Sequence, residues 1–172
     1  MLFRKSLHHK CFIAMQKNKH WEKAVLNLAI KQTYKDDEFW QILLNESNAQ
    51  SGPFDGGCLI CAKAIMNAAD GSELVRIVSP LNGGQTEHYG VRLSGKVYDF
   101  DGIAHSSQQW IDRFQSNESI TDRELSFAVG YDSTTQTPDD PRAVRLISKT
   151  IMRKMIGQKH AASTTQIEKR RL

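Results

Sequence analysis

The stretch HYGVRLSGKVYDFD (residues 88–101) alternates apolar and polar side chains on both sides of the dipeptide Ser94-Gly95. A period of two residues around a Ser-Gly pair is typical of two antiparallel strands joined by a tight turn. If the turn has two residues, Leu93 pairs with Lys96, and this pair sets the register of all the others. The sequence therefore predicts a β-hairpin with one coherent apolar face.

The polar face of this hairpin carries a candidate catalytic histidine and two carboxylates. Counting outward from the turn places His88 opposite Asp101, with Asp99 one diagonal step away. A carboxylate beside an imidazole fixes its tautomer and stabilises its charged form. We therefore expect Asp101 to orient His88, and Asp99 is the second choice for this role.

A second chemical feature precedes the hairpin, at Cys58. Residues 50–57 are dense in turn formers and residues 58–69 are apolar on most sides, which predicts a loop followed by a buried helix. Cys58 opens that helix directly after Gly56-Gly57, where free backbone N–H groups and the helix dipole favour a thiolate and offer an oxyanion site. Cys61 lies one turn further into the helix and is expected to be a buried small apolar residue.

The remaining patterns predict an α+β protein, in which N-terminal helices and the cysteine helix precede a small antiparallel sheet. Helical patterns cover residues 7–33, 36–44, 58–69 and 106–114 and a final segment from residue 141; strand patterns cover residues 74–78, 89–93, 96–101 and 125–129. Three apolar stripes are expected to face the core: Leu7, Cys11, Phe12 and Met15; Trp21, Val25, Leu28 and Ala29; and Val144, Ile147, Ile151 and Met155.

These elements divide the chain into four expected parts. Residues 1–50 form a basic helical part that packs on the core, and residues 51–140 form the catalytic core. An amphipathic basic helix follows over residues 141–158. Residues 159–172 have almost no apolar side chain to bury, so a disordered tail is expected there.

Charge is distributed unevenly along the chain. Residues 1–35 carry eight Lys or Arg and one Glu, residues 36–141 carry six Lys or Arg and seventeen Asp or Glu, and residues 142–172 carry nine Lys or Arg and one Glu. Two explanations stay open: the basic ends contact an anionic partner, such as nucleic acid or a membrane surface, or they pack on the acidic middle.

The sequence also suggests where the protein acts. No stretch approaches the roughly 20 apolar residues that span a bilayer, and the N-terminal residues lack the apolar core of a signal peptide. The three cysteines make no even disulfide framework, which fits a reducing compartment. We expect a cytoplasmic protein, or one delivered into a target cell without a classical signal peptide.

Two segments resemble known cysteine enzymes. The stretch GCLICAKAI (residues 57–65) resembles the cysteine-helix entry of papain-like folds, especially the papain-fold domains of bacterial toxins and effectors. Residues 88–101 are similar to the His-to-Asp hairpin of transglutaminase-like enzymes. The resemblance spans about 45 residues and implies a papain-like fold with a catalytic triad of Cys58, His88 and Asp101.

One position departs from the papain-like pattern. Papain-like peptidases carry a glutamine six residues before the nucleophile, and this chain has Gly52 there. That glutamine donates to the oxyanion, so its place must be taken by another group. Gln50 is the candidate, with Ser51 as an alternative.

These features predict a cysteine-dependent hydrolase or acyltransferase that acts on an amide bond of a protein or peptide, as a thiol protease, glutamine deamidase or amidase, without a cofactor. Two alternatives stay open. Cys58, Cys61 and His88 are residue types that bind zinc. The basic ends would also suit a non-enzymatic protein that binds nucleic acid or a membrane surface.

Overall fold

The computed structural model describes residues 19–80, 83–120, 124–134 and 136–169, and within these ranges it describes the side chains of residues 24–158. The protein is α+β, as predicted. Its helices are α2 (Lys19–Tyr34), α3 (Asp37–Gln41), the π-helical turn η1 (Ile42–Glu46), α4 (Cys58–Ala68), α5 (Ser107–Asn117) and α6 (Pro141–Lys169). Its strands are β1 (Glu73–Ser79), β2 (Gln85–Leu93), β3 (Lys96–Asp99), β4 (Gly102–Ala104) and β5 (Ser126–Val129).

The strands form one antiparallel sheet in the order β4-β3-β2-β1-β5. The predicted hairpin register is confirmed, because Leu93 pairs with Lys96 and Val91 pairs with Tyr98. The predicted length of the second strand is wrong, because β3 ends at Asp99 and the chain turns into β4, where Gly102 pairs with Asp99. Gly102 adopts a φ of +122°, which favours glycine and lets the chain reverse there.

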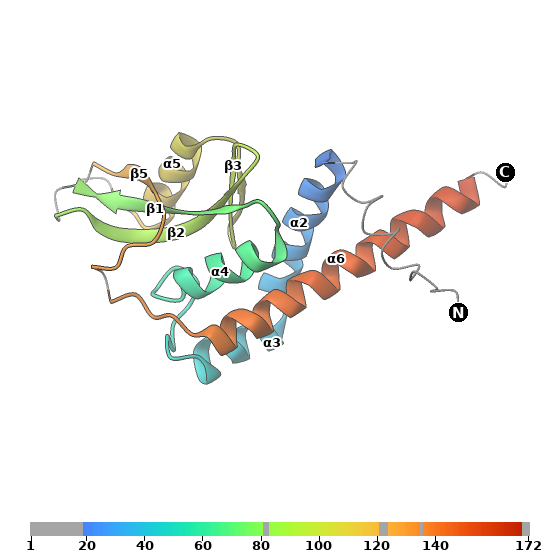
Figure 1. The fold of residues 1–172 in the computed structure, drawn as a ribbon, viewed down its shortest axis with the longest axis horizontal. Coiled ribbons are helices and arrows are strands. Elements are labelled where there is room, and N and C mark those ends of the chain that lie inside the picture. The colour runs from blue at the N-terminus through green and yellow to red at the C-terminus, as the bar shows by residue number, and fades with distance from the viewer. Residues whose placement is uncertain (1–18, 81–82, 121–123, 135, 170–172) are drawn as a thin grey trace, which may run out of the picture.

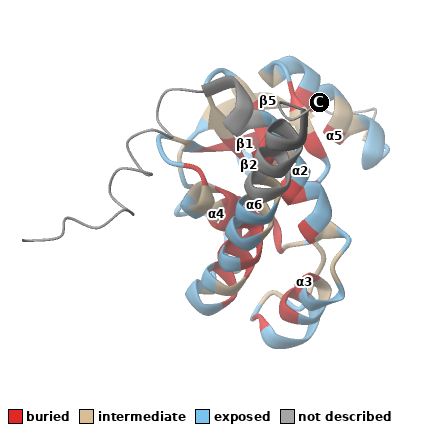
Figure 2. Ribbon diagram, turned by 90° about the vertical axis from the view of Figure 1, so that its right-hand side faces the viewer, coloured by how far each residue is buried: buried red, intermediate tan, exposed pale blue. Residues whose placement is uncertain are grey.

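The sheet separates two groups of helices (Figure 1). On one face, α4 packs between the sheet and α6, and α2 and α3 complete this helical layer. On the other face, α5 covers a smaller apolar cluster that includes Val75, Val97 and Trp110. Figure 2 shows buried residues on the inner sides of the helices and exposed residues on their outer sides. The larger core therefore lies around α4, the helix that begins with Cys58.

Helix α2 buries a stripe that is rotated from the predicted one. Val25 and Ala29 are buried as expected, but the prediction was wrong for Leu28, which is 47% exposed. Leu26 and Ile30 are buried in its place, because α2 turns this side toward the core. The side chain of Trp21 and the stripe expected over residues 7–15 lie outside the described residues.

Helix α6 buries the predicted stripe and is longer than predicted. Val144, Ile147 and Ile151 are buried, and Met155 packs against the same core. The helix continues to Lys169, so the tail expected from residue 159 is wrong over residues 159–169. These residues include Ala, Gln, Lys and Glu and contain no Pro or Gly, so backbone propensity favours a helix even with few apolar side chains.

Ion pairs connect basic α6 to the acidic residues before α4. Arg142, Arg153 and Lys154 lie within ion-pair distance of Glu46, Glu38 and Asp36, respectively. This part of the charge asymmetry is thus compensated within the protein. None of the described helices is both long enough and apolar enough to cross a membrane.

The buried stripe of α6 provides a test of the fold. Ile147→Ala should lower the free energy of unfolding by about 2–5 kcal/mol, because the side chain is fully buried and its removal leaves a cavity. Ile156→Ala is the matched control, since the same side chain on the same helix is 55% exposed. It should change the stability by less than about 0.5 kcal/mol. Urea denaturation followed by circular dichroism measures both, and equal losses would contradict the packing of α6.

Candidate active site

Cys58 is the first residue of α4, and the preceding glycine is required by close packing. A Cβ atom at Gly57 would lie 2.8 Å from the carbonyl oxygen of Gly52 and 3.0 Å from a methyl group of Leu43. Any larger residue would push the start of α4 away from this loop. Cys58 is only 6% exposed, and its position leaves the first N–H groups of α4 without intrahelical acceptors.

A pocket of about 230 Å³ opens beside Cys58. Its walls come from three places: the loop and start of α4, the first half of β2, and the segment between β5 and α6. The lining residues are Gly56, Cys58, Gln85, Thr86, Glu87, Tyr89, Gln136, Thr137 and Pro138. A substrate in this pocket would lie directly against the thiol.

His88 lies on β2, and two aromatic rings hold its imidazole. The ring of Phe54 stacks on it at a centroid distance of 5.3 Å, and the ring of Phe114 stacks at 5.0 Å. Trp110 makes a third, tilted contact at 5.7 Å. The histidine is 1% exposed, so packing rather than solvent determines the plane of its ring.

The carboxylate that faces His88 belongs to Asp99. Oδ2 of Asp99 lies 3.4 Å from Nε2 of His88. Within the described part of the chain, neither ring nitrogen makes a well-aligned hydrogen bond, so the contact is that of a loose ion pair. Such contacts commonly tighten only when a substrate binds. Because Nε2 faces Asp99, Nδ1 is the ring nitrogen left for the thiol of Cys58.

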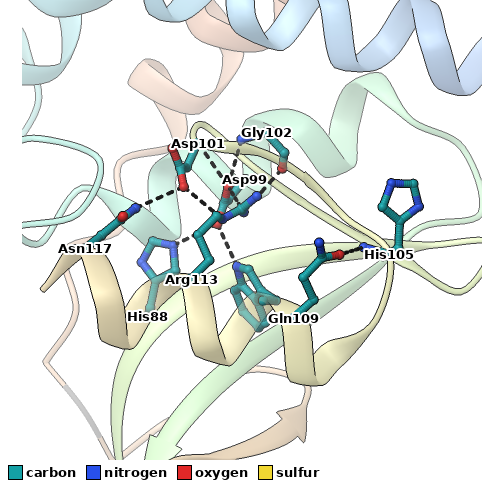
Figure 3. Close-up of polar contacts among 9 residues, drawn as sticks. His88, Asp99, Asp101, Gly102, His105, Gln109, Arg113 and Asn117 are labelled. Carbon is teal, nitrogen blue, oxygen red and sulfur yellow. Dashed lines mark hydrogen bonds and ion pairs between the residues drawn. The ribbon is translucent and has the colours of Figure 1, made fainter. Parts of the chain in front are cut away.

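Asp99 is itself held by four donors (Figure 3). The indole Nε1 of Trp110 donates to Oδ2 at 2.6 Å, and Nη2 of Arg113 donates to Oδ1 at 2.7 Å. The backbone N–H groups of Asp101 and Gly102 also donate to Oδ1, at 2.9 and 3.1 Å. These last two bonds close the turn between β3 and β4.

Asp101 does not take the role expected of it. The predicted pairing of Asp101 with His88 does not form, because the pairing of β2 with β3 ends at Tyr98 and the chain turns into β4 after Asp99. Its exposed carboxylate lies 2.8 Å from Nε of Arg113 and accepts from the amide of Asn117 at 3.0 Å. The second choice, Asp99, is therefore the carboxylate next to the imidazole.

The surroundings of His88 and Asp99 favour the charged form of each. Burial is the largest influence on the histidine and opposes its charge, but the polar contacts and charges of Asp99 and Cys58 outweigh it and raise the pKa of His88 to about 9. Burial likewise opposes the charge on Asp99, but His88, Arg113 and Trp110 together lower the pKa of its carboxyl. The site is therefore suited to hold an imidazolium at neutral pH.

Cys61 lies in a different environment although it is one helical turn away. It is buried in the main core and is not among the residues that line the pocket. Burial, together with the nearby Cys58 and Asp99, raises the pKa of the Cys61 thiol well above its ordinary value. A protonated, enclosed thiol is a poor nucleophile, in agreement with its expected packing role.

The structure does not bring Gln50 to the pocket. Gln50 is exposed, with a φ of +48°, and it does not line the cavity. Two other glutamines, Gln85 and Gln136, do line the pocket, and no sequence signal marked either of them.

His105 is exposed and lies apart from His88 (Figure 3), with its backbone N–H bound to Gln109.

The residues that hold His88 and Asp99 were also missed as site residues. Trp110 and Phe114 have the spacing of inward-facing residues on an ordinary amphipathic helix, and no motif in the sequence marks Arg113. The usable signal was the spacing of Trp110, Arg113 and Phe114, which places all three on one side of α5.

Within the described residues, no three His, Cys, Asp or Glu side chains converge into a possible metal site.

Scans of this chain against protein-family models, curated proteins and solved structures find no match.

The ionisation of His88 can be measured directly. Histidine-labelled protein followed by NMR should show one imidazole that titrates near pH 9. Asp99→Asn should lower this pKa, because it removes a negative charge that stabilises the imidazolium, whereas Asp101→Asn should shift it less. Since the folded pKa exceeds the ordinary value of 6.5, the contribution of His88 to stability is complete below pH 6.5 and is lost as the pH rises through 9. A midpoint at or below 6.5 would contradict this electrostatic picture.

Proposed function

We propose that this protein is a cysteine-dependent hydrolase or acyltransferase that acts on an amide bond, with Cys58 as nucleophile, His88 as general base and acid, and Asp99 as the residue that orients the imidazole. The observation that carries the proposal is that His88 of β2 has two polar partners, the carboxylate of Asp99 on β3 at 3.4 Å and the thiol of Cys58 on α4, and that Cys58 also lines a pocket. Each group has the neighbours that its role needs.

The reaction would proceed in two steps. The thiolate of Cys58 attacks the carbonyl carbon of the amide, and the imidazolium of His88 gives its proton to the leaving amine as the C–N bond breaks. A thioester remains on Cys58. His88 then takes a proton from water as the water oxygen attacks the thioester, and breaking of the C–S bond restores the thiolate and the imidazolium. An amine in place of water makes the reaction an acyl transfer.

The negative oxygen of the tetrahedral intermediate needs hydrogen-bond donors. The free N–H groups at the start of α4 lie where Cys58 attacks, and the helix dipole adds a partial positive charge there. Gln85 and Gln136 also line the pocket, and their side-chain amides can serve as further donors. These groups support an oxyanion site that does not use Gln50.

Thiol labelling tests the choice of nucleophile. At neutral pH, iodoacetamide should label Cys58 at least about tenfold faster than Cys61, because only Cys58 has an imidazolium partner and access to the pocket. Peptide mapping by mass spectrometry measures each site. Cys61→Ala is the control and should leave the rate at Cys58 unchanged. Equal labelling of the two cysteines, or faster labelling of Cys61, would refute the assignment.

Substitution of the two carboxylates tests which one orients His88. Asp99→Asn should slow labelling of Cys58 by about tenfold or more, since in a comparable triad the same change cost about 10⁴ in turnover. Asp101→Asn is the matched control, because Asp101 contacts Arg113 but not the imidazole, and its effect should be smaller. His88→Ala should slow labelling most. If Asp101→Asn is the more damaging of the two, Asp99 is not the orienting carboxylate. Thermal melts of each variant separate these effects from loss of the fold.

A further inference from the structure

One wall of the pocket beside Cys58 belongs to no helix or strand. It consists of Gln136, Thr137 and Pro138, in the segment that joins β5 to α6. Across the pocket lie the first residues of β2 and the start of α4. The shape of the pocket therefore depends on what fixes this segment to the sheet.

Asp132 fixes the beginning of the segment. Its side chain, 7% exposed, accepts hydrogen bonds from Nη1 of Arg76 and Oγ1 of Thr86, both at 2.8 Å. It also accepts from the backbone N–H and the hydroxyl of Thr134, at 2.9 and 2.6 Å. The backbone N–H of Asp132 donates to the phenol oxygen of Tyr89 at 3.2 Å. One carboxylate thus joins β1, β2 and the segment.

Two of these partners are themselves part of the pocket. Thr86 and Tyr89 line it, and Asp132 binds the polar group of each. The pKa of Asp132 is lowered to about 2 by hydrogen bonds from Thr134 and Thr86 and by the charge of Arg76. The carboxylate therefore stays ionised at any ordinary pH. At the far end, Asp139 binds Nζ of Lys63 on α4. The wall formed by residues 136–138 is therefore held at both ends, by Asp132 before it and by Asp139 after it.

The lining of the pocket also indicates what it accepts. No Lys, Arg or His is among the described residues that line it, while Gln85, Gln136 and Glu87 contribute polar side chains to the lining. A carboxylate on the substrate would meet no cation of this lining and would lie near the acidic side chain of Glu87, which is unfavourable. An uncharged polar group can instead form hydrogen bonds with the carboxamides.

We propose that this pocket is the subsite for an uncharged polar side chain of a peptide substrate, such as that of glutamine, and that Asp132 is the positioning residue that holds its outer wall. The inference rests on the proposed function, because it takes Cys58 as the nucleophile. It adds the substrate class and a residue that the triad does not include.

Two chloromethyl ketones test the substrate class. N-acetyl-Ala-Gln and N-acetyl-Ala-Glu chloromethyl ketones differ only in the charge of one side chain, and each forms a thioether at Cys58 with release of chloride. The glutamine compound should inactivate at least about tenfold faster per unit concentration, with a rate that saturates. Mass spectrometry of modified Cys58 gives the rates. Equal rates, or a faster glutamate compound, would overturn the proposed class.

Substitution of Asp132 tests the positioning role. Asp132→Ala should raise the half-saturating concentration of the glutamine compound about tenfold, while the maximal rate and the labelling of Cys58 by iodoacetamide change less than about twofold. Asp132→Asn keeps one acceptor oxygen, so its half-saturating concentration should lie between that of the unsubstituted protein and that of Asp132→Ala. Glu73→Ala is the matched control, because it removes an exposed carboxylate–arginine pair from the other end of β1 and should change nothing.

The outcomes separate this inference from the proposed function. Slow labelling of Cys58 by iodoacetamide that does not depend on His88 would refute the proposed function. Normal labelling with an unchanged half-saturating concentration in Asp132→Ala would refute only the inference. If Asp132→Ala does not fold, Thr134→Ala removes the 2.6 Å hydroxyl bond alone and should raise the half-saturating concentration about threefold. No rise in that variant would equally overturn the role of Asp132.

Discussion

The buried carboxylate of Asp99 is the group on which the candidate site depends most. A buried anion is costly unless hydrogen-bond donors and cations surround it. Here an indole, a guanidinium and two backbone N–H groups donate to the carboxylate, and the imidazole lies at ion-pair distance. These groups come from β2, from the turn after β3 and from α5. Satisfying one carboxylate therefore brings three elements together, and each of them contributes to the placement of His88.

This arrangement explains why α5 matters although it carries no proposed catalytic residue. Trp110 and Arg113 hold Asp99, and Phe114 stacks on the imidazole that Asp99 faces. Gly90 on β2 belongs to the same arrangement, because a Cβ atom there would lie 2.6 Å from the ring of Trp110. The small residue on the strand and the large one on the helix fit each other, and the fit keeps α5 close enough for its side chains to reach the sheet.

The two cysteines of α4 show how much one helical turn changes a thiol. Cys58 lies at the N-terminus of the helix, beside free N–H groups, an imidazole and a pocket. Cys61 lies within the apolar core, where burial favours the neutral form. The difference is one of surroundings, since both residues have the same chemistry and belong to the same helix. The segment held by Asp132 lines the pocket beside Cys58 and therefore affects access to this thiol. Cys61 does not line the pocket, so the segment has no such effect on it.

Local sequence patterns were enough to predict the α+β class, the hairpin register from Leu93 and Lys96, the start of α4 at Cys58, and His88 as the candidate base. Each depends on residues close together in the chain, through periodicity, a two-residue turn or a helix start. The choice between Asp99 and Asp101 depends on how separate elements pack. The predicted register holds up to Tyr98, but the pairing ends before Asp101, and Trp110 and Arg113, eleven and fourteen residues after Asp99, bind the carboxylate of Asp99. Likewise, Gln85 and Gln136 meet at the pocket, and Asp132 meets Arg76 and Thr86, only because the sheet and the segment before α6 fold against each other. Local pattern carries no information about such contacts, because they depend on how separate elements pack.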